Sequence, residues 1–325
     1  MTEPRRAPRF TGVRTFAGLA HTALEELFAP AQARRAGRPA AHPRAVVVGV
    51  PFDTATSWRA GARFGPEAIR SASALLRPFH AVHGVQALAA VTDAGDVAIT
   101  PGNAARSSEQ IAATLAPVCR SATVPLVLGG DHLVALGELR AQAAAHGSLA
   151  LVLLDAHADT WEDYYGERLF HGTVLRRAVE EGLVDPERSL IAGLRGSVYA
   201  PDDLAQARAL GFELIAIEQL RAMAPADFGA LVRERVARKQ LFLSVDIDVV
   251  DPSAAPGTGT PEVGGLLAAE LIELLRALAG MRFSGFDVVE VCPPYDSPGQ
   301  ITALLAASVA YEMLALSAIG KEQRT

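Results

Sequence analysis

The chain has 325 residues, of which 50% are hydrophobic and 20% charged, and its formal net charge is −6. This length and apolarity exclude disorder over most of the chain and allow one large α/β domain or two ordinary ones. The negative net charge does not attract nucleic acid electrostatically, so a nucleic-acid partner is not expected.

Residues 1–44 predict a mostly irregular N-terminal arm, in which Ala33–Pro43 forms a surface linker. The arm lacks the continuous apolar core of a secretory signal. Its many arginines resemble a mitochondrial transit peptide, but Glu3, Glu25 and Glu26, together with several prolines, argue against that interpretation. We therefore expect no targeting function in this segment.

The two cysteines, Cys119 and Cys292, form neither a CxxC motif nor a local pair. Their spacing disfavours both a disulfide scaffold and a thiolate zinc site. No later apolar run is expected to reach the length of a membrane span. These features predict a protein of the reducing cytoplasm with no membrane partner.

From Ala45 onward, apolar strands alternate with helical patterns, so residues 45–325 are expected to form one domain. The expected strands are Ala45–Val50, Ala89–Asp93, Pro125–Leu128, Leu149–Leu154, Ser189–Gly193, Glu213–Ile217, Leu241–Val245 and Gly285–Val291. The expected helices are Gly65–Leu76, Ala104–Arg120, Leu133–His146, Val174–Glu181, Asp202–Leu210, Ala226–Arg238, Leu266–Ala279 and Gln300–Ala318. Buried β-branched runs separated by helices predict parallel strands with crossover helices on both faces of the sheet.

The number of strands does not distinguish a closed barrel from an open, doubly wound sheet. Both architectures place functional loops at the carboxyl ends of their strands. Unusual residues follow several of the expected strands, namely Gly129–His132, Asp155–Asp159, Asp246–Asp251 and Glu290. These segments are therefore expected to meet at one edge of the sheet.

Acids and a histidine follow two buried runs: Asp155, His157 and Asp159 after Leu149–Leu154, and Asp246, Asp248 and Asp251 after Leu241–Val245. In an extended chain, residues i, i+2 and i+4 point to one side, so each run presents its polar side chains as one set. Clustered buried carboxylates need a compensating positive charge. Two divalent ions would supply it.

The ligand types narrow the choice of metal. Imidazoles among carboxylates, without a thiolate, suit Mn²⁺, with Ni²⁺, Fe²⁺ or Co²⁺ possible and Zn²⁺ less natural. Carboxylates can bridge two ions, and a water shared by such a pair becomes acidic enough to be hydroxide near neutral pH. The implied chemistry is hydrolysis.

Several motifs together resemble the signatures of the ureohydrolase family, which includes arginase, agmatinase and guanidinobutyrase. They are Gly-Gly-Asp-His (129–132), Asp-Ala-His-Ala-Asp (155–159) and Ser-Val-Asp-Ile-Asp-Val-Val-Asp-Pro with the glycine- and threonine-rich stretch after it (244–265). Segments at Arg59–Pro66, His171–Thr173 and Asp287–Val291 also resemble family segments in the expected order. The similarity covers about Ala45 to Ala318.

The resemblance implies a three-layer α/β/α fold around a central, mainly parallel, eight-stranded sheet, which is the open form. It makes residues 45–325 the catalytic domain. It also implies two Mn²⁺ per subunit, one held by His132, Asp155, Asp159 and Asp246 and the other by Asp155, His157, Asp246 and Asp248. Asp155 and Asp246 would bridge the two ions.

The resemblance further implies that His171, Asp159 and Glu290 act in catalysis. His171 would be the proton shuttle to the leaving amine, a task that imidazole performs near neutral pH. Glu290 would bind the planar guanidinium as a carboxylate fork, and a hydroxyl hydrogen bond from Thr260 would orient it. Asp251 and Asp131 are expected to cap a turn and to bond loop amides, respectively.

The substrate is expected to be a linear guanidino compound. The stretch Thr160–Tyr165 differs from the arginase segment that recognises an α-amino acid and is more similar to the agmatinase and guanidinobutyrase branch. In the loop Arg195–Asp203, Arg195 and Tyr199 could meet an acidic tail, which places 4-guanidinobutyrate first. Agmatine is second, because a cationic tail would need unpaired acids such as Glu162 or Asp163, and arginine is third.

Two functions from other classes stay open at this point. An amide hydrolase of the related deacetylase fold would hold one zinc with one histidine and two aspartates. An inactive metal-binding relative would be expected to lack His171 or a ligand, and this chain retains all of them. The family resemblance also implies a homo-oligomer, either a trimer or a hexamer.

Overall fold

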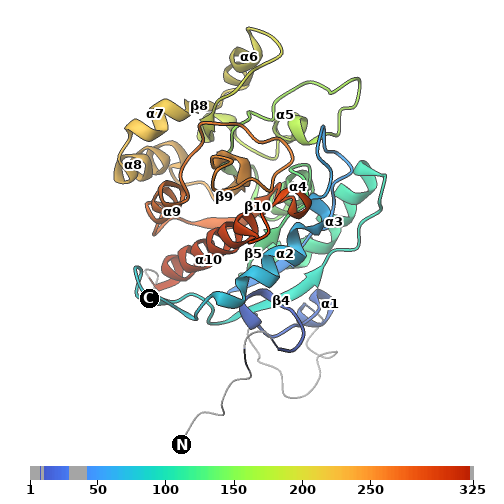
Figure 1. Cartoon of the computed structure of the whole chain (residues 1–325), viewed down its shortest axis with the longest axis vertical. Helices are drawn as coiled ribbons and strands as arrows, with labels where there is room; N and C mark the ends of the chain where they lie inside the picture. Colours follow the sequence, from blue (N-terminus) through green and yellow to red (C-terminus); the bar gives the residue numbers. More distant parts are fainter. Residues whose placement is uncertain (1–7, 9–10, 29–41, 323–325) are drawn as a thin grey trace, which may run out of the picture.

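The computed structural model describes residue 8, residues 11–28 and residues 42–322 (Figure 1). Its main sheet has eight strands in the order β4-β1-β5-β10-β9-β6-β7-β8, and every neighbouring pair is parallel. The strands are β1 (Ala45–Gly49), β4 (Val91–Asp96), β5 (Val124–Leu128), β6 (Ala150–Leu154), β7 (Leu190–Leu194), β8 (Glu213–Ala216), β9 (Leu241–Asp246) and β10 (Phe283–Val289). The sheet is open, and the open form expected from the family resemblance is confirmed.

Helices cover both faces of this sheet (Figure 1). On one face lie α2 (Gly65–Ala72), α7 (Ile217–Ala222), α8 (Pro225–Val236), α9 (Ala268–Arg276) and α10 (Ile301–Glu322). On the other lie α3 (Ala104–Cys119), α4 (Val134–His146), α5 (Val174–Glu180) and α6 (Asp203–Ala209). The fold is therefore a three-layer α/β/α sandwich.

Alternate residues of each central strand enter the two halves of the core. In β9, Leu241 and Leu243 pack with one set of helices, whereas Phe242 packs with the other. All three side chains are fully buried. Because successive side chains of a strand point to opposite faces, a strand that is covered on both sides must be apolar throughout. This explains why the strand runs of the sequence are continuously hydrophobic.

All eight expected strands and all eight expected helices are present, with ends that differ by a few residues. The sequence patterns missed α1 (Leu24–Leu27), α7 and a hairpin of β2 (Phe79–His80) and β3 (Val85–Gln86). Two-residue strands and helices of four to six residues are too short to show a hydrophobic period. The pattern also extended β8 by one residue into Ile217, where α7 begins.

By length and composition, the segment Ile301–Ile319 of α10 could cross a membrane, which corrects the expectation that no run reaches that length. Within the structure, however, 78% of the apolar window is buried. The helix packs against α2, α9 and β10 (Figure 1). Its apolarity is accounted for by its position in the core, as is usual for a helix that is hydrophobic on all sides.

Part of the N-terminal segment packs against the rest of the protein. Phe16 is fully buried in the core, and its N–H donates to Asp93 Oδ2 at 2.7 Å. Arg70 donates to the same carboxylate, from Nε to Oδ2 at 2.9 Å. The expected linker Ala33–Pro43 lies almost entirely outside the described residues.

Candidate functional site

The candidate site residues follow four strands that are neighbours in the middle of the sheet, in the order β5-β10-β9-β6. His132 follows β5, Glu290 follows β10, Asp246 ends β9 and Asp155 follows β6. Parallel strands bring their carboxyl ends to one edge, which is where open α/β sheets bind ligands. Segments far apart in the sequence therefore meet at this edge.

The ligands that follow β6 and β9 are brought together by short turns. The sequence pattern instead predicted an extended chain in which alternate residues point to one side, and the structure corrects this. Asp155 lies just after β6, and its Oδ1 accepts the N–H of His157 at 2.6 Å. Asp246 ends β9, and its Oδ1 accepts the N–H of Asp248 at 2.9 Å. Aspartate side chains commonly stabilise such turns by bonding the amide two residues on.

One group of side chains surrounds His132. Its Nδ1 lies 2.9 Å from Asp159 Oδ2, 3.3 Å from Asp155 Oδ2 and 3.5 Å from Asp246 Oδ2. His132, Asp155 and Asp159 are close enough together to hold one metal ion. All four side chains are at least nine-tenths buried.

A second group surrounds His157. Its Nδ1 lies 3.0 Å from Asp248 Oδ2 and 3.5 Å from Asp155 Oδ1. These three residues are also close enough to hold an ion. Asp155 belongs to both groups and directs one carboxylate oxygen to each histidine. The arrangement suits a carboxylate that bridges two ions.

The donor atoms of these groups fit a metal pair. His132 Nδ1 and Asp155 Oδ2 are buried and close to their neighbours, but neither makes a well-directed hydrogen bond. Burial raises the pKa of Asp246 well above its usual value, and the charges of Asp248 and Asp155 add to this effect. Crowded, buried carboxylates are stabilised by a cation, and carboxylate oxygen with imidazole nitrogen suits Mn²⁺ and similar divalent ions.

Ser244 orients His132 from the side away from the carboxylates. His132 Nε2 lies 3.0 Å from Ser244 Oγ, and Ser244 lies on β9, two residues before Asp246. A hydrogen bond at Nε2 leaves Nδ1 free to face the carboxylates. Metal-binding histidines are commonly held in this way by a partner at the other ring nitrogen.

His171 and Glu290 form a buried pair beside these groups. His171 Nδ1 lies 2.9 Å from Glu290 Oε1, which also accepts the N–H of His132 at 2.9 Å. On the other side of the ring, the Ser57 N–H donates to Nε2 at 3.1 Å. Burial alone would lower the pKa of His171, but the carboxylates of Glu290, Asp159 and Asp131 together raise it.

Two of the candidate residues have left-handed backbones. Asp159 has a φ of 51° and Glu290 a φ of 62°. This region is costly for residues other than glycine and persists where the surrounding structure enforces it, often at functional sites. At Glu290 the N–H donates to Gly130 O at 2.8 Å, which ties the end of β10 to the loop that carries His132.

A pocket opens at this edge of the sheet, and its wall includes His157, Asp159, His171, Asp246 and Thr260. Glu290 is 1% exposed and is not part of the wall. Its Oε2 is buried and has no hydrogen-bond partner.

The expected hydrogen bond from Thr260 to Glu290 is absent among the described residues, which corrects that prediction. Thr260 Oγ1 instead lies 3.5 Å from Asp248 Oδ2. Thr260 still lines the pocket. Its hydroxyl is therefore directed to the carboxylate group around His157, and the motif alone could not show which acid it would meet.

Arg195 lines the pocket, but its guanidinium is used by the protein itself. Nη2 faces the carbonyls of Asp248 at 2.6 Å and Glu262 at 2.8 Å, and the other two nitrogens face those of Gly193, Val249 and Val263 at 3.2 Å. All of its donors thus point to main-chain acceptors. The expected contact of Arg195 with an acidic tail is contradicted by this geometry, and the residue instead ties together the loops around Asp248.

Tyr199 does not line the pocket, contrary to the expectation that it meets the substrate tail. Its side chain is 73% exposed and packs edge-on against Trp161, with ring centroids 5.3 Å apart. Trp161 does line the pocket and lies over Gly172, where a Cβ atom would come within 2.7 Å of the ring. The aromatic wall of the pocket is therefore Trp161.

Neither acid that was considered for a cationic tail is part of the pocket wall. Glu162 pairs with Arg168 at 2.6 Å, and Asp163 Oδ1 accepts the N–H of Gly166 at 2.9 Å. The turn-stabilising roles expected for two other acids are confirmed. Asp131 accepts from the amides of Ala55 and Leu133, and Asp251 from those of Ser253 and Gly264.

Sequence reasoning missed Ser57 and Ser244 as parts of the site. Ser244 shares the alternate-residue pattern of Asp246 in β9, so the pattern could have identified it. Ser57 lies 114 residues before its partner His171, and no spacing or motif connects the two.

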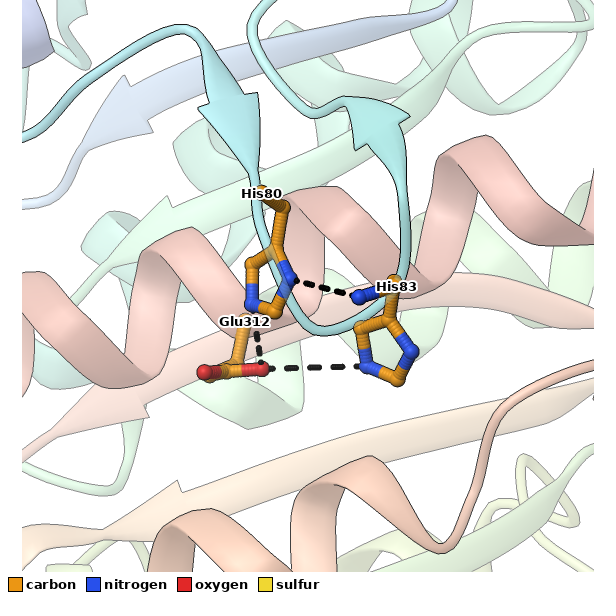
Figure 2. Close-up of side chains that lie close together, drawn as sticks. All are labelled: His80, His83 and Glu312. Atoms are coloured by element: carbon orange, nitrogen blue, oxygen red, sulfur yellow. Dashed lines mark hydrogen bonds and ion pairs between the residues drawn. The ribbon is translucent and has the colours of Figure 1, made fainter.

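A third cluster with metal-binding residue types, His80, His83 and Glu312, lies between the β2–β3 hairpin and α10 (Figure 2). The N–H of His83 donates to His80 Nδ1 at 3.2 Å, and His80 Nε2 lies 3.0 Å from Glu312 Oε2. Because Nδ1 accepts, the proton of His80 is on Nε2, which donates to Glu312. Arg276 Nη2 pairs with Glu312 Oε1 at 2.7 Å and balances its charge. The hydrogen bonds and charges of His80 and Glu312 are thus satisfied without a cation.

Comparisons with known proteins agree with this geometry. A family model described as the arginase family matches residues 43–315. The chain is 40% identical to a guanidinobutyrase of Pseudomonas aeruginosa, over 94% of this chain and 93% of that protein. It is 41% identical to a mitochondrial agmatinase of Gallus gallus, over 83% of this chain and 80% of the relative.

A solved structure shares the whole architecture. The proclavaminate amidinohydrolase of Streptomyces clavuligerus superposes with a TM-score of 0.87 and 38% sequence identity. The alignment covers 97% of this chain and 100% of that one.

Proposed function

The chain belongs to the arginase family of hydrolases that act on guanidino groups, and we propose that it cleaves a linear guanidino acid, with 4-guanidinobutyrate preferred, to urea and an amine. The observation that carries this proposal is the pair of histidine–carboxylate groups that share Asp155 and place His157 and Asp159 in the pocket wall. A deacetylase-like site with a single ion would need only one such group.

The six residues proposed to hold two ions are His132, Asp155, His157, Asp159, Asp246 and Asp248. When bound, such ions supply a water that is ionised near neutral pH, which is the nucleophile that hydrolysis of a guanidine requires. Mn²⁺ is the preferred ion on ligand chemistry, with Ni²⁺, Fe²⁺ and Co²⁺ as alternatives. The protein's own contribution is to hold the carboxylates and imidazoles fixed by the turns and by Ser244.

His171 is proposed to carry the proton to the leaving amine. An amine is a poor leaving group until it is protonated, and a positioned imidazole supplies such a proton efficiently near neutral pH. The Glu290 carboxylate at Nδ1 stabilises the protonated ring, whose Nε2–H can donate to Ser57 Oγ, 2.8 Å away. His171 lies in the pocket wall, where it can reach a bound substrate.

Glu290 is proposed to bind the guanidinium. Its Oε1 is engaged by His132 and His171, so the free acceptor is Oε2, which is buried without a partner. A buried carboxylate oxygen is costly unless it meets a donor, and a guanidinium supplies charged N–H donors. This arrangement supports one strong contact through Oε2 rather than an open two-oxygen fork.

The preference for an acidic tail is supported by the positions of Glu162 and Asp163, two acids that are not metal ligands. Glu162 and Asp163, the acids that the sequence suggests for a cationic tail, lie outside the pocket wall and have partners of their own. Agmatine is kept as the second candidate because the named relatives include both a guanidinobutyrase and an agmatinase at similar identity.

A urea-release assay on the Mn²⁺-loaded enzyme tests the proposal. We expect kcat/KM to be highest for 4-guanidinobutyrate, lower for agmatine and lowest for arginine. Preference for arginine would contradict the branch assignment, and release of acetate from an acetylated amine without urea release would favour the deacetylase-like alternative.

Three further expectations stay proposals. Residues 1–44 form an arm and linker and residues 45–325 the catalytic domain. The protein acts in the cytoplasm, as a homo-oligomer of three or six subunits by family resemblance.

A further inference from the structure

The ionisable side chains of the pocket wall differ in whether they have a hydrogen-bond or ion-pair partner within the protein. They are His157, Asp159, His171, Arg195, Asp203, Arg208 and Asp246. Six of them have hydrogen bonds or ion pairs within the protein. Among the described residues, Arg208 is exposed and has no side-chain hydrogen bond or ion pair. It is therefore the wall residue whose charge is available to a ligand.

Arg208 sits on a helix that is fixed in place. It lies in the last turn of α6, and its carbonyl accepts the N–H of Gly211 at 2.8 Å. The preceding residue, Ala207, is fully buried in the core. The guanidinium can thus move, whereas its backbone is held by packing. Such a side chain can close on a ligand without a rearrangement of the fold.

The rest of the wall suits an aliphatic chain between two polar ends. Leu194, Val198, Leu204 and Trp161 line the pocket, which also contains the carboxylates of Asp159 and Asp246. A linear guanidino acid has the matching sequence of a guanidinium, a run of methylenes and a carboxylate. Apolar lining with a few placed polar groups is the usual composition of a small-molecule site.

On this basis, and resting on the proposed function, we infer that Arg208 binds the carboxylate tail of the substrate and selects guanidino acids over guanidino amines. A guanidinium and a carboxylate form charge-assisted hydrogen bonds that are often bidentate. The same positive charge would repel the ammonium of agmatine. Arg208 thus takes the role that was expected of Arg195.

Asp203, also on α6, is the alternative anchor, because it would attract a cationic tail instead. Its Oδ2 accepts the N–H groups of Tyr199 at 2.9 Å and Ala200 at 3.2 Å. The carboxylate therefore already stabilises the turn that leads into α6. Arg208 has no such structural role, and this difference favours the acidic tail.

The test compares kcat/KM for 4-guanidinobutyrate and agmatine in four full-length, metal-loaded variants. Arg208→Gln should lower the value for 4-guanidinobutyrate about 10- to 100-fold, mainly through KM, and leave agmatine unchanged or improved. Arg208→Lys should retain part of the preference, and Arg208→Glu should reverse it. Arg188→Gln is the matched control, because Arg188 is also exposed and does not line the pocket.

Calorimetric titration with 4-guanidinobutyrate separates this inference from the proposed function. Weaker binding to Arg208→Gln than to wild type supports the inference even if turnover is slow. Equal Kd and equal kcat/KM in Arg208→Gln and wild type would overturn it while hydrolysis itself stands. A wild type that prefers agmatine and loses this preference on Asp203→Asn would also overturn it. No urea from any guanidino compound would instead contradict the proposed function.

Discussion

His171 Nδ1 lies 2.9 Å from Glu290 Oε1, although the two residues are 119 positions apart in the sequence. The carboxylate fixes the tautomer of the imidazole and favours its protonated form, because a negative charge next to a histidine raises its pKa. The pair also joins the two tasks proposed for the site, proton delivery by His171 and guanidinium binding by Glu290. Substitutions of His171 and of Glu290 test the two tasks one at a time.

Replacing His171 by alanine should lower kcat about 10²- to 10⁴-fold, the usual scale for loss of a general acid–base. The metal content should not change, because His171 belongs to neither metal group. Steady-state kinetics and elemental analysis of the same sample give both numbers. His146→Ala, at the exposed end of α4, is the control. A wild-type kcat in His171→Ala at neutral pH would remove the shuttle role.

The variant Glu290→Gln keeps an oxygen for the His132 N–H but loses the negative charge. We expect KM to rise for every guanidino substrate, because the buried oxygen no longer offers a charged acceptor to the guanidinium. A charged hydrogen bond of this kind contributes about 1.5–3 kcal/mol, so the rise should be roughly tenfold or more. If only kcat falls, Glu290 acts through His171 alone.

Ser244→Ala should weaken metal binding while the fold is kept. The change removes the contact to His132 Nε2, and loss of such an orienting partner typically costs about 10- to 100-fold in metal affinity. Competition with a chelator measures the affinity, and circular dichroism checks the fold. An unchanged affinity would show that Ser244 does not orient the ligand.

The cluster in Figure 2 predicts a pH-dependent stability. Burial and the neighbouring His80 lower the pKa of His83. Because unfolded His83 takes up a proton more readily than folded His83, the free energy of unfolding should fall as the pH falls below about 6.5. His83→Asn should reduce this fall. Denaturant unfolding of both metal-free proteins at about pH 7.5 and about pH 5.5 measures the difference. Parallel losses would contradict the assignment.

The metal candidates could be predicted from sequence because each set lies within a few residues of one strand end. Local turns then bring Asp155 with His157 and Asp246 with Asp248 to one side. The parallel order of the strands brings the two sets together, and continuous apolar runs already indicate parallel strands. Predicting these residues required no knowledge of long-range contacts beyond the fold class.

The contacts of Arg195, Thr260 and Arg208 could not be predicted in the same way. Arg195 has the right chemistry for an acidic tail, but apart from that of Gly193 the carbonyls that surround it come from residues 50 or more positions away. Thr260 meets Asp248, 12 residues earlier, rather than Glu290, and its motif does not indicate which acid lies within reach. Arg208 lies in a seven-residue helix with no motif, and only its place in the pocket wall identifies it.

The central claim, a site that needs two metal ions, is tested most directly by removing the metal and returning Mn²⁺ in steps. Chelation should abolish urea release from 4-guanidinobutyrate. Activity should return as the content rises to two ions per chain, measured by elemental analysis and assay of the same samples. Full activity with one ion per chain, or with none, would contradict the account.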